Sequence, residues 1–163
     1  MRSPKPGAPA SEEIRTVVVN RRARHDYTIL DKIEAGIVLR GPEVKSIRGG
    51  KVNLGDAYAQ VERGELWLVS MHISPYVQAN RENADPLRRR KLLLHRRQIA
   101  RIRQTIEEKG LTLIPLSLYF KGNLLKVELG VAKGKRQHDR REDMAKRDAE
   151  REMDRARRGD RGD

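Results

Sequence analysis

The stretch NRRARHDY, residues 20–27, places arginines beside a histidine and a tyrosine within eight residues. Planar rings stack on unpaired bases and guanidinium groups bind phosphates, so this mixture suits single-stranded or looped RNA. The same residues could also form a solvated, basic first helix with no partner. Because the rings are interleaved with the arginines, we favour the RNA-binding interpretation.

The sequence contains no recognisable catalytic constellation. Its four histidines, His25, His72, His95 and His138, lie far apart, and none belongs to an HExxH or similar metal-ligand spacing. The glycine-rich stretch RGGKVNLG lacks the GK[ST] ending of a phosphate-binding loop. There is no cysteine, which excludes disulfides, thiolate metal sites and cysteine nucleophiles. We therefore predict a protein that is not an enzyme and holds no metal or cofactor.

The distribution of charge favours a nucleic-acid partner. The 163 residues include 36 Lys or Arg and 23 Asp or Glu, a formal net charge of +13. Residues 133–163 hold twelve of the basic and nine of the acidic side chains, so most of the excess lies in residues 1–132. A cationic body points to RNA or DNA. The chain shows neither the apolar stretch of a signal peptide nor the ~20 apolar residues that span a bilayer, which predicts a cytoplasmic protein.

Three further features have both a structural and a functional interpretation. Glu34 lies in a predicted strand, where a salt bridge is the commoner role and a hydrogen bond from RNA is the alternative. The run RRRKLLLHRR surrounds three leucines, which we assign to the core, with more cations than stability alone would favour. Trp67 and Phe120 alternate with aliphatic residues and are also assigned to the core.

The remaining patterns predict a small antiparallel barrel. RTVVVN and TILDKIEAGIVL read as strands, the second with a bulge expected at Ala35 and Gly36. Two hairpins are expected, one turning at residues 63–64 and one at residues 121–123. Between them, residues 74–91 read as a linker and about residues 95–109 as an amphipathic helix ended by Gly110. About six strands with three short or medium helices fit a mainly β fold, a closed barrel of the oligonucleotide-binding type.

Composition divides the chain into a flexible leader (1–13), a barrel domain (14–132) and a basic tail (133–163). In the tail, 21 of 31 residues are charged and none is aromatic or β-branched. Such a segment buries too little apolar surface to offset a backbone entropy of roughly 1–2 kcal/mol per residue. Opposite charges spaced i, i+4, such as Asp143 and Arg147, nevertheless favour a helix. We predict a tail that is disordered when free and helical when bound.

Five blocks of the sequence resemble the signature blocks of the bacterial SsrA-binding protein (SmpB) family, in the same order and spacing. They are NRRARHDY, EAGIVLRGPEVKSIRGGKVNLGDAY, DPLRRRKLLLHRRQI, LIPLSLYFKGN and GVAKGKRQHDRRED. The resemblance implies an oligonucleotide-binding-type barrel that grips the tRNA-like domain of tmRNA. It further implies delivery of that RNA, with elongation factor Tu and GTP, to stalled ribosomes for trans-translation.

The resemblance also implies which side chains face the RNA. These positions are Asn20, Arg22, Arg24, His25, Tyr27, Glu34, Leu93, His95, Lys126 and Lys133. For Glu34 the resemblance favours an RNA contact, whereas the position in a strand of a basic protein favours a salt bridge. A carboxylate that accepts hydrogen bonds from RNA is chemically reasonable within a cationic surface.

For the tail, the resemblance implies a place in the empty mRNA channel of the small ribosomal subunit, near the decoding centre. The residues that would neutralise ribosomal RNA phosphates there are Lys135, Arg136, His138, Arg140 and Arg141. A channel filled by message would exclude the tail, so a stall could be sensed without catalysis. The expected partners are tmRNA, the ribosome and, through the RNA complex, elongation factor Tu; the protein itself is expected to be a monomer without a membrane partner.

Two other classes of protein stay open. A ribosomal or general RNA-binding protein would share the basic barrel but would bind many RNAs with a similar, steep salt dependence and no selectivity for tmRNA. An RNA-modifying enzyme would need a cofactor site or clustered catalytic groups, and the sequence offers neither.

Overall fold

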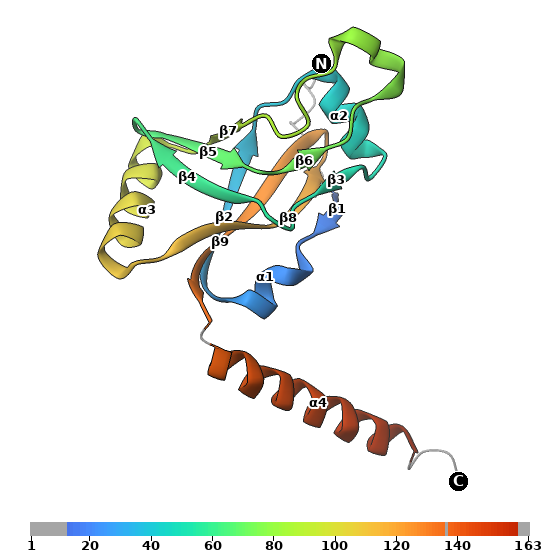
Figure 1. Cartoon of the computed structure of the whole chain (residues 1–163), viewed down its shortest axis with the longest axis vertical. Coiled ribbons are helices and arrows are strands. Elements are labelled where there is room, and N and C mark those ends of the chain that lie inside the picture. The colour runs from blue at the N-terminus through green and yellow to red at the C-terminus, as the bar shows by residue number, and fades with distance from the viewer. Residues whose placement is uncertain (1–12, 136, 160–163) are drawn as a thin grey trace, which may run out of the picture.

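The computed structural model describes residues 13–135 and 137–159, without the side chains of residues 80, 81 and 137–140. It is a β-barrel with short helices around it and one long helix leading away from it (Figure 1). The strands are β1 (Ile14–Val19), β2 (Tyr27–Ile37), β3 (Val52–Asn53), β4 (Tyr58–Glu62), β5 (Glu65–Val69), β6 (His72–Ile73), β7 (Arg90–Leu93), β8 (Thr112–Lys121) and β9 (Leu124–Gly134). The helices are α1 (Arg21–Asp26), α2 (Gly41–Arg48), the 3₁₀ helix η1 (Val77–Glu82), α3 (Arg96–Lys109) and α4 (Gln137–Gly159).

Six strands close the barrel in the order β8-β4-β5-β7-β2-β9, and β9 pairs again with β8. All of these pairs are antiparallel. β1 extends the sheet beyond the ring by pairing with residues 117–121 of β8. Closure leaves few unpaired strand edges, which is how a small sheet becomes stable. The predicted fold, a mainly β barrel of about six antiparallel strands with short helices, is confirmed.

Two hairpin turns of the ring follow directly from local sequence. Arg63 and Gly64, between β4 and β5, have φ values of 52° and 77°. Positive φ at both central residues defines a two-residue turn whose twist matches that of the flanking strands. Gly122, between β8 and β9, has a φ of 61°. Both predicted turns are confirmed.

The amphipathic helix α3 packs its apolar side on the barrel. Ile99 and Ile102 are buried, and Ile106 packs against the same core cluster. Gly110 ends the helix in the left-handed region with a φ of 61°, and its N–H donates to the Ile106 carbonyl. This helix and its glycine stop are confirmed.

A second apolar cluster holds α1 against the barrel. Ala23 packs with Ile114, Leu116 and Ala132, apart from the main core. The side-chain amide of Asn20 donates to the Pro115 carbonyl at 2.9 Å and to the Leu54 carbonyl at 3.3 Å. A helix of six residues would not persist alone in water, so these contacts with β8 and its neighbours are what stabilise α1.

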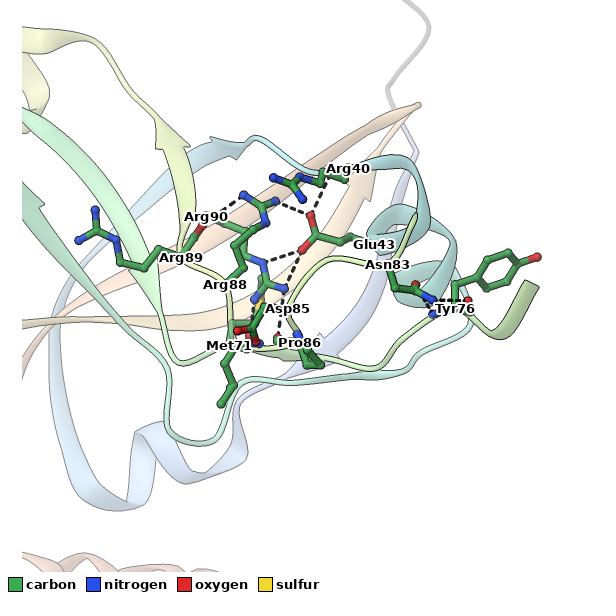
Figure 2. A network of polar contacts seen from close by, with 11 residues as sticks. Arg40, Glu43, Met71, Tyr76, Asn83, Asp85, Pro86, Arg88, Arg89 and Arg90 are labelled. Carbon is green, nitrogen blue, oxygen red and sulfur yellow. Dashed lines mark hydrogen bonds and ion pairs between the residues drawn. The ribbon is translucent and has the colours of Figure 1, made fainter. Parts of the chain in front are cut away.

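A buried charge network ties α2 to β7 and the loop before it (Figure 2). Glu43 accepts from the Arg40 backbone N–H at 2.9 Å, from Arg88, and from Nε of Arg90 at 2.8 Å. Arg90 is fully buried and also donates to the backbone carbonyls of Met71 and, at 3.1 Å, of Pro86. Burial by itself would raise the pKa of Glu43, but the hydrogen bonds from these donors outweigh it and lower the pKa.

The segment after the first hairpin differs from the prediction. The expected linker at residues 74–91 contains η1, and its last two residues begin β7, which pairs with β5 and β2. A four-residue strand inside a cationic run shows almost no alternation of apolar and polar residues. It forms a strand because it pairs with a neighbour on each side. The predicted bulge is also misplaced: Ala35 and Gly36 pair regularly, and β2 shifts register between Ile29 and Asp31.

The assignment of the aromatic and leucine residues to the core holds only in part. Phe120 and Leu92 are buried in the core cluster, and Leu94 packs against it. Leu93, in contrast, is 51% exposed. Trp67 is wrongly assigned, because it alternates with the buried Leu66 and Leu68 and so faces outward, with the Arg89 guanidinium 4.7 Å from its ring centroid.

The C-terminal segment forms α4 from Gln137 to Gly159, the helical form that its i, i+4 charge pairs predict. It leaves the barrel at the end where α1 lies (Figure 1). That the free tail is disordered, and that the domain boundaries fall at residues 13–14 and 132–133, remain predictions. None of the helices in the described part of the chain is long and apolar enough to cross a membrane.

Candidate RNA interface

The residues predicted to face RNA lie along the antiparallel strands β2 and β9 and at the two ends of this pair. Thr28 lies opposite Lys133 at one end, and Gly36 lies opposite Lys126 at the other. α1 precedes β2 at the first end, and β7 pairs with Gly36 through Leu93 at the second. At about 3.3 Å per residue, the two ends are separated by more than roughly 20 Å. The candidate interface is therefore an elongated strip rather than a pocket.

The first end of the strip is formed by α1 and the start of β2. Arg22, Arg24 and His25 are exposed, and Tyr27 is half-buried against the small apolar cluster beneath α1. Nδ1 of His25 lies 2.9 Å from a carboxylate oxygen of Asp26. Two exposed guanidinium groups beside two rings can bind phosphates and stack on bases, as the sequence pattern suggested.

Asn20 lies at the same end but inside it. Its side chain is 9% exposed, and its amide nitrogen already donates to two backbone carbonyls. The structure therefore gives Asn20 a definite role in fixing the start of α1. A direct contact between Asn20 and RNA stays a prediction.

The second end of the strip brings together four of the predicted residues that are distant in sequence. Glu34, Leu93, His95 and Lys126 line one open groove of about 430 Å³. They come from β2, β7, the start of α3 and β9. His95 is exposed and precedes the first turn of α3, where its backbone N–H donates to the Gln98 side chain at 3.1 Å. An aliphatic side chain, a ring, a cation and a carboxylate thus converge on one surface.

Glu34 has protein partners as well as exposure. Its Oε2 accepts a hydrogen bond from the Tyr119 hydroxyl, and its Oε1 lies 3.5 Å from Nζ of Lys121. The salt bridge expected for a carboxylate in a strand of a basic protein is therefore confirmed. Its side chain is still 39% exposed. The hydrogen bond from Tyr119 and the positive charge of the neighbouring lysines, which together outweigh the effect of burial, lower the pKa of Glu34, so the carboxylate is ionised at neutral pH.

Tyr119 and Lys121 are not among the site residues predicted from the sequence. They alternate with the core residues Leu118 and Phe120 on β8, a pattern that indicates two outward-facing side chains. The pattern does not indicate which residue they meet. β8 and β2 are separated by β9 in the barrel, so their contact with Glu34 appears only in the closed sheet.

The predicted tail residues fall into two groups. The Lys135 side chain is only 7% exposed; its Nζ donates to the Arg24 carbonyl at 2.8 Å and pairs with Asp143. Arg141 is exposed on α4. Arg136 lies outside the described residues, as do the side chains of His138 and Arg140. In the structure Lys135 joins α1 to α4, and its predicted contact with ribosomal phosphates remains untested.

The described residues include no group of three or more His, Asp or Glu side chains that could hold a metal ion. Another groove of the described part lies between α3 and strands β5 and β7 and measures about 710 Å³. Two of the four cations that line it, Lys91 and Arg103, are paired with Glu65 and Glu107. The strip along β2 and β9 therefore remains the better candidate site.

Comparison with known proteins identifies the family. The chain is 62% identical over 140 residues to the SsrA-binding protein of Carboxydothermus hydrogenoformans, covering 86% of this chain and 94% of the relative. It is 61% identical to the SsrA-binding protein of Acetivibrio thermocellus over 90% of this chain and 95% of that one. A solved structure described as "tmRNA-SmpB: a journey to the center of the bacterial ribosome" matches with a TM-score of 0.62 and 49% identity, over 77% of this chain and 92% of the other. The model of the SmpB protein family matches residues 17–159, so the chain belongs to the SmpB family.

Proposed function

We propose that this protein binds the tRNA-like domain of tmRNA and takes part in trans-translation on stalled ribosomes. The observation that carries the proposal is the high identity to SsrA-binding proteins over most of the chain, which includes the whole β2–β9 strip. The strip itself has the chemistry for RNA, since exposed arginines and rings lie at one end and a carboxylate among cations lies at the other.

The two ends of the strip would contribute differently to binding. Arg22 and Arg24 are exposed cations that fit phosphates, whose contacts give affinity and salt dependence without reading sequence. Glu34 carries only acceptors, so it fits a hydroxyl or base-edge N–H and repels phosphate. A surface that combines both can distinguish one folded RNA from others of equal charge.

We further propose that the tail acts on the ribosome and the barrel acts on the RNA. A slender helix such as α4, with exposed Arg141 near its start, would fit a narrow passage lined by phosphates, the empty mRNA channel. Elongation factor Tu with GTP would join through the RNA complex, and the protein would act as a cytoplasmic monomer. Its contribution to rescue would be binding and not catalysis.

The test compares the full chain with a chain ending after Lys135, which keeps β9 and the contacts of Lys135 with α1. Labelled tRNA-like-domain RNA is titrated with each protein, with a scrambled RNA of equal length as competitor, and rescue of stalled ribosomes is measured in parallel. We expect both proteins to bind the RNA selectively and only the full chain to support rescue.

Equal binding of both RNAs at moderate salt would contradict the proposal and favour a general RNA-binding protein. Selectivity that disappears with the tail would contradict the division between barrel and tail. A chain ending after Lys135 that still supports rescue would show that α4 is not the ribosome-reading element.

A further inference from the structure

The Glu34 carboxylate is held from β8, two strands away. Tyr119 donates its hydroxyl to Oε2 of Glu34, and Lys121, two residues further along β8, lies 3.5 Å from Oε1. β9 lies between β2 and β8, and its Lys126 pairs with Tyr119 on one side and with Gly36 on the other. Three neighbouring strands therefore converge on one carboxylate.

The tyrosine is a much more rigid partner than the glutamate. Tyr119 is 7% exposed, and its backbone is paired with Thr16 of β1 and with Lys126 of β9. Glu34 is 39% exposed on a strand and has three side-chain torsions. Since one partner is fixed and the other is free to rotate, the hydrogen bond restricts the glutamate to the orientation that the tyrosine dictates.

The charge states of the two groups strengthen this hydrogen bond. Burial, and then the neighbouring carboxylate, raise the pKa of Tyr119 above its usual range, so its hydroxyl stays a donor. The hydrogen bond from Tyr119 in turn lowers the pKa of Glu34. A hydrogen bond from a neutral hydroxyl to an ionised carboxylate is shorter and stronger than one between neutral groups.

The hydrogen bond also leaves the two carboxylate oxygens unequal. Oε2 accepts from Tyr119, whereas the polar contact of Oε1 within the described part of the chain is the long one with Lys121. Glu34 lines the groove that also contains Leu93, His95 and Lys126. A ligand in this groove would therefore meet one carboxylate oxygen with acceptor capacity left, and a carboxylate can only accept.

We propose that Tyr119 is a positioning residue for RNA recognition: it binds one oxygen of Glu34 and so aims the other at a hydroxyl or N–H donor of the RNA. This inference rests on the proposed function, because it requires that Glu34 contacts RNA. It adds a specificity determinant that itself has almost no exposed surface. Lys121 assists by keeping the carboxylate ionised.

The test is a double-mutant cycle with Tyr119→Phe and Glu34→Gln, measured by binding of tRNA-like-domain RNA. Tyr119→Phe removes one oxygen atom and keeps the ring. We expect a loss of affinity of about fivefold, the usual effect of one hydrogen bond. In the Glu34→Gln background the amide oxygen can still accept the Tyr119 hydroxyl but lacks the charge that strengthens this hydrogen bond, so the same change should have a smaller effect. Tyr58→Phe, at an exposed tyrosine on β4, is the matched control and should bind like the unchanged protein.

A second measurement separates positioning from a general structural effect. The pKa of the Glu34 carboxyl is followed by NMR, and Tyr119→Phe should raise it while the melting temperature stays near that of Tyr58→Phe. An unchanged Glu34 pKa would overturn the inference, as would equal losses of affinity in the two Glu34 backgrounds.

The outcomes for the two proposals are distinct. If Glu34→Gln weakens binding and Tyr119→Phe does not, positioning by Tyr119 is overturned and the Glu34 contact stands. If Glu34→Gln leaves binding unchanged, the RNA contact of Glu34 fails, and positioning by Tyr119 fails with it. Neither result decides the proposed function, which is tested by the selectivity of the full chain for the tRNA-like RNA.

Discussion

Single residues in the candidate interface differ in how far they can distinguish one RNA from another. Cations such as Arg22 bind any phosphate, so their effect is shared by all RNAs. Glu34 is the exception, because an ionised carboxylate placed near Lys121 and Lys126 repels phosphates and accepts hydrogen bonds from donor groups. In the proposed RNA contact, the protein partners of Glu34 would fix the charge and the orientation of its carboxylate.

At the residue scale, we predict that Arg22→Gln lowers RNA affinity about five- to tenfold, the range expected for losing one hydrogen bond between charged groups at a partly exposed site. The slope of log affinity against log salt should fall by about one, because one phosphate contact is lost. Filter binding at several salt concentrations measures both. Lys109→Gln, which removes an exposed cation at the end of α3, is the control. Equal effects of the two variants would show that net charge, and not α1, determines binding.

At the scale of elements, the strip depends on contacts that lie outside it. α2 contributes Glu43, and β7 contributes the fully buried Arg90, which the carboxylate neutralises (Figure 2). β7 pairs through Leu93 with Gly36 of β2 and so brings the second end of the strip together. Removal of a partner from a buried ion pair leaves an uncompensated charge, which costs far more than the pair contributes.

We predict that Glu43→Gln lowers the free energy of unfolding by about 3–5 kcal/mol, measured by urea denaturation at pH 7. Glu62→Gln, which removes the partner of Arg89 at an exposed position, should have a far smaller effect on the same free energy, because water screens this pair. A Glu43 variant as stable as the Glu62 variant would contradict this account of the network.

The same network has a defined pH dependence. The folded pKa of Glu43 is lowered, so its contribution to stability is present above the unfolded pKa of about 4.3 and is lost as the pH falls through the lower folded value. Below about pH 4, the unchanged protein should therefore lose more stability than Glu43→Gln does.

At the scale of the whole molecule, Lys135 and Arg147 link the barrel to the tail, since Arg147 of α4 donates to the Arg24 carbonyl of α1 at 3.4 Å. The Lys135 backbone N–H donates to the Asp26 carbonyl at 2.9 Å, and the Lys135 Nζ donates to the Arg24 carbonyl at 2.8 Å. These carbonyls lie at the C-terminal end of α1, where a cation is favourable. Because Nζ also pairs with Asp143 of α4, the direction in which the tail leaves is coupled to α1.

We predict that Lys135→Met broadens the distribution of distances between α3 and α4. The absence of cysteine allows spin labels at Gln104→Cys and Ala149→Cys, both exposed, for measurement by pulsed electron resonance. Lys133→Met removes an exposed neighbouring charge and should leave the distribution unchanged. If both variants gave the distribution of the unchanged protein, Lys135 would not set the direction of the tail.

The sequence by itself determined the features that depend on neighbours along the chain. The hairpin turns at Gly64 and Gly122 and the apolar stripe of Ile99 and Ile102 are local, and each was predicted correctly. Four of the predicted RNA-facing residues also meet in one groove, although their positions came from resemblance and not from local pattern.

Only the tertiary structure decided which side chains meet across the barrel. Trp67 faces outward because β5 is one wall of a closed ring with a single interior, and β7 is a strand because it has partners on both sides. Tyr119 reaches Glu34 across β9 from 85 residues away in sequence. Such contacts are set by ring closure and strand register, which depend on the whole fold, whereas turns and helix faces depend on the few residues that form them.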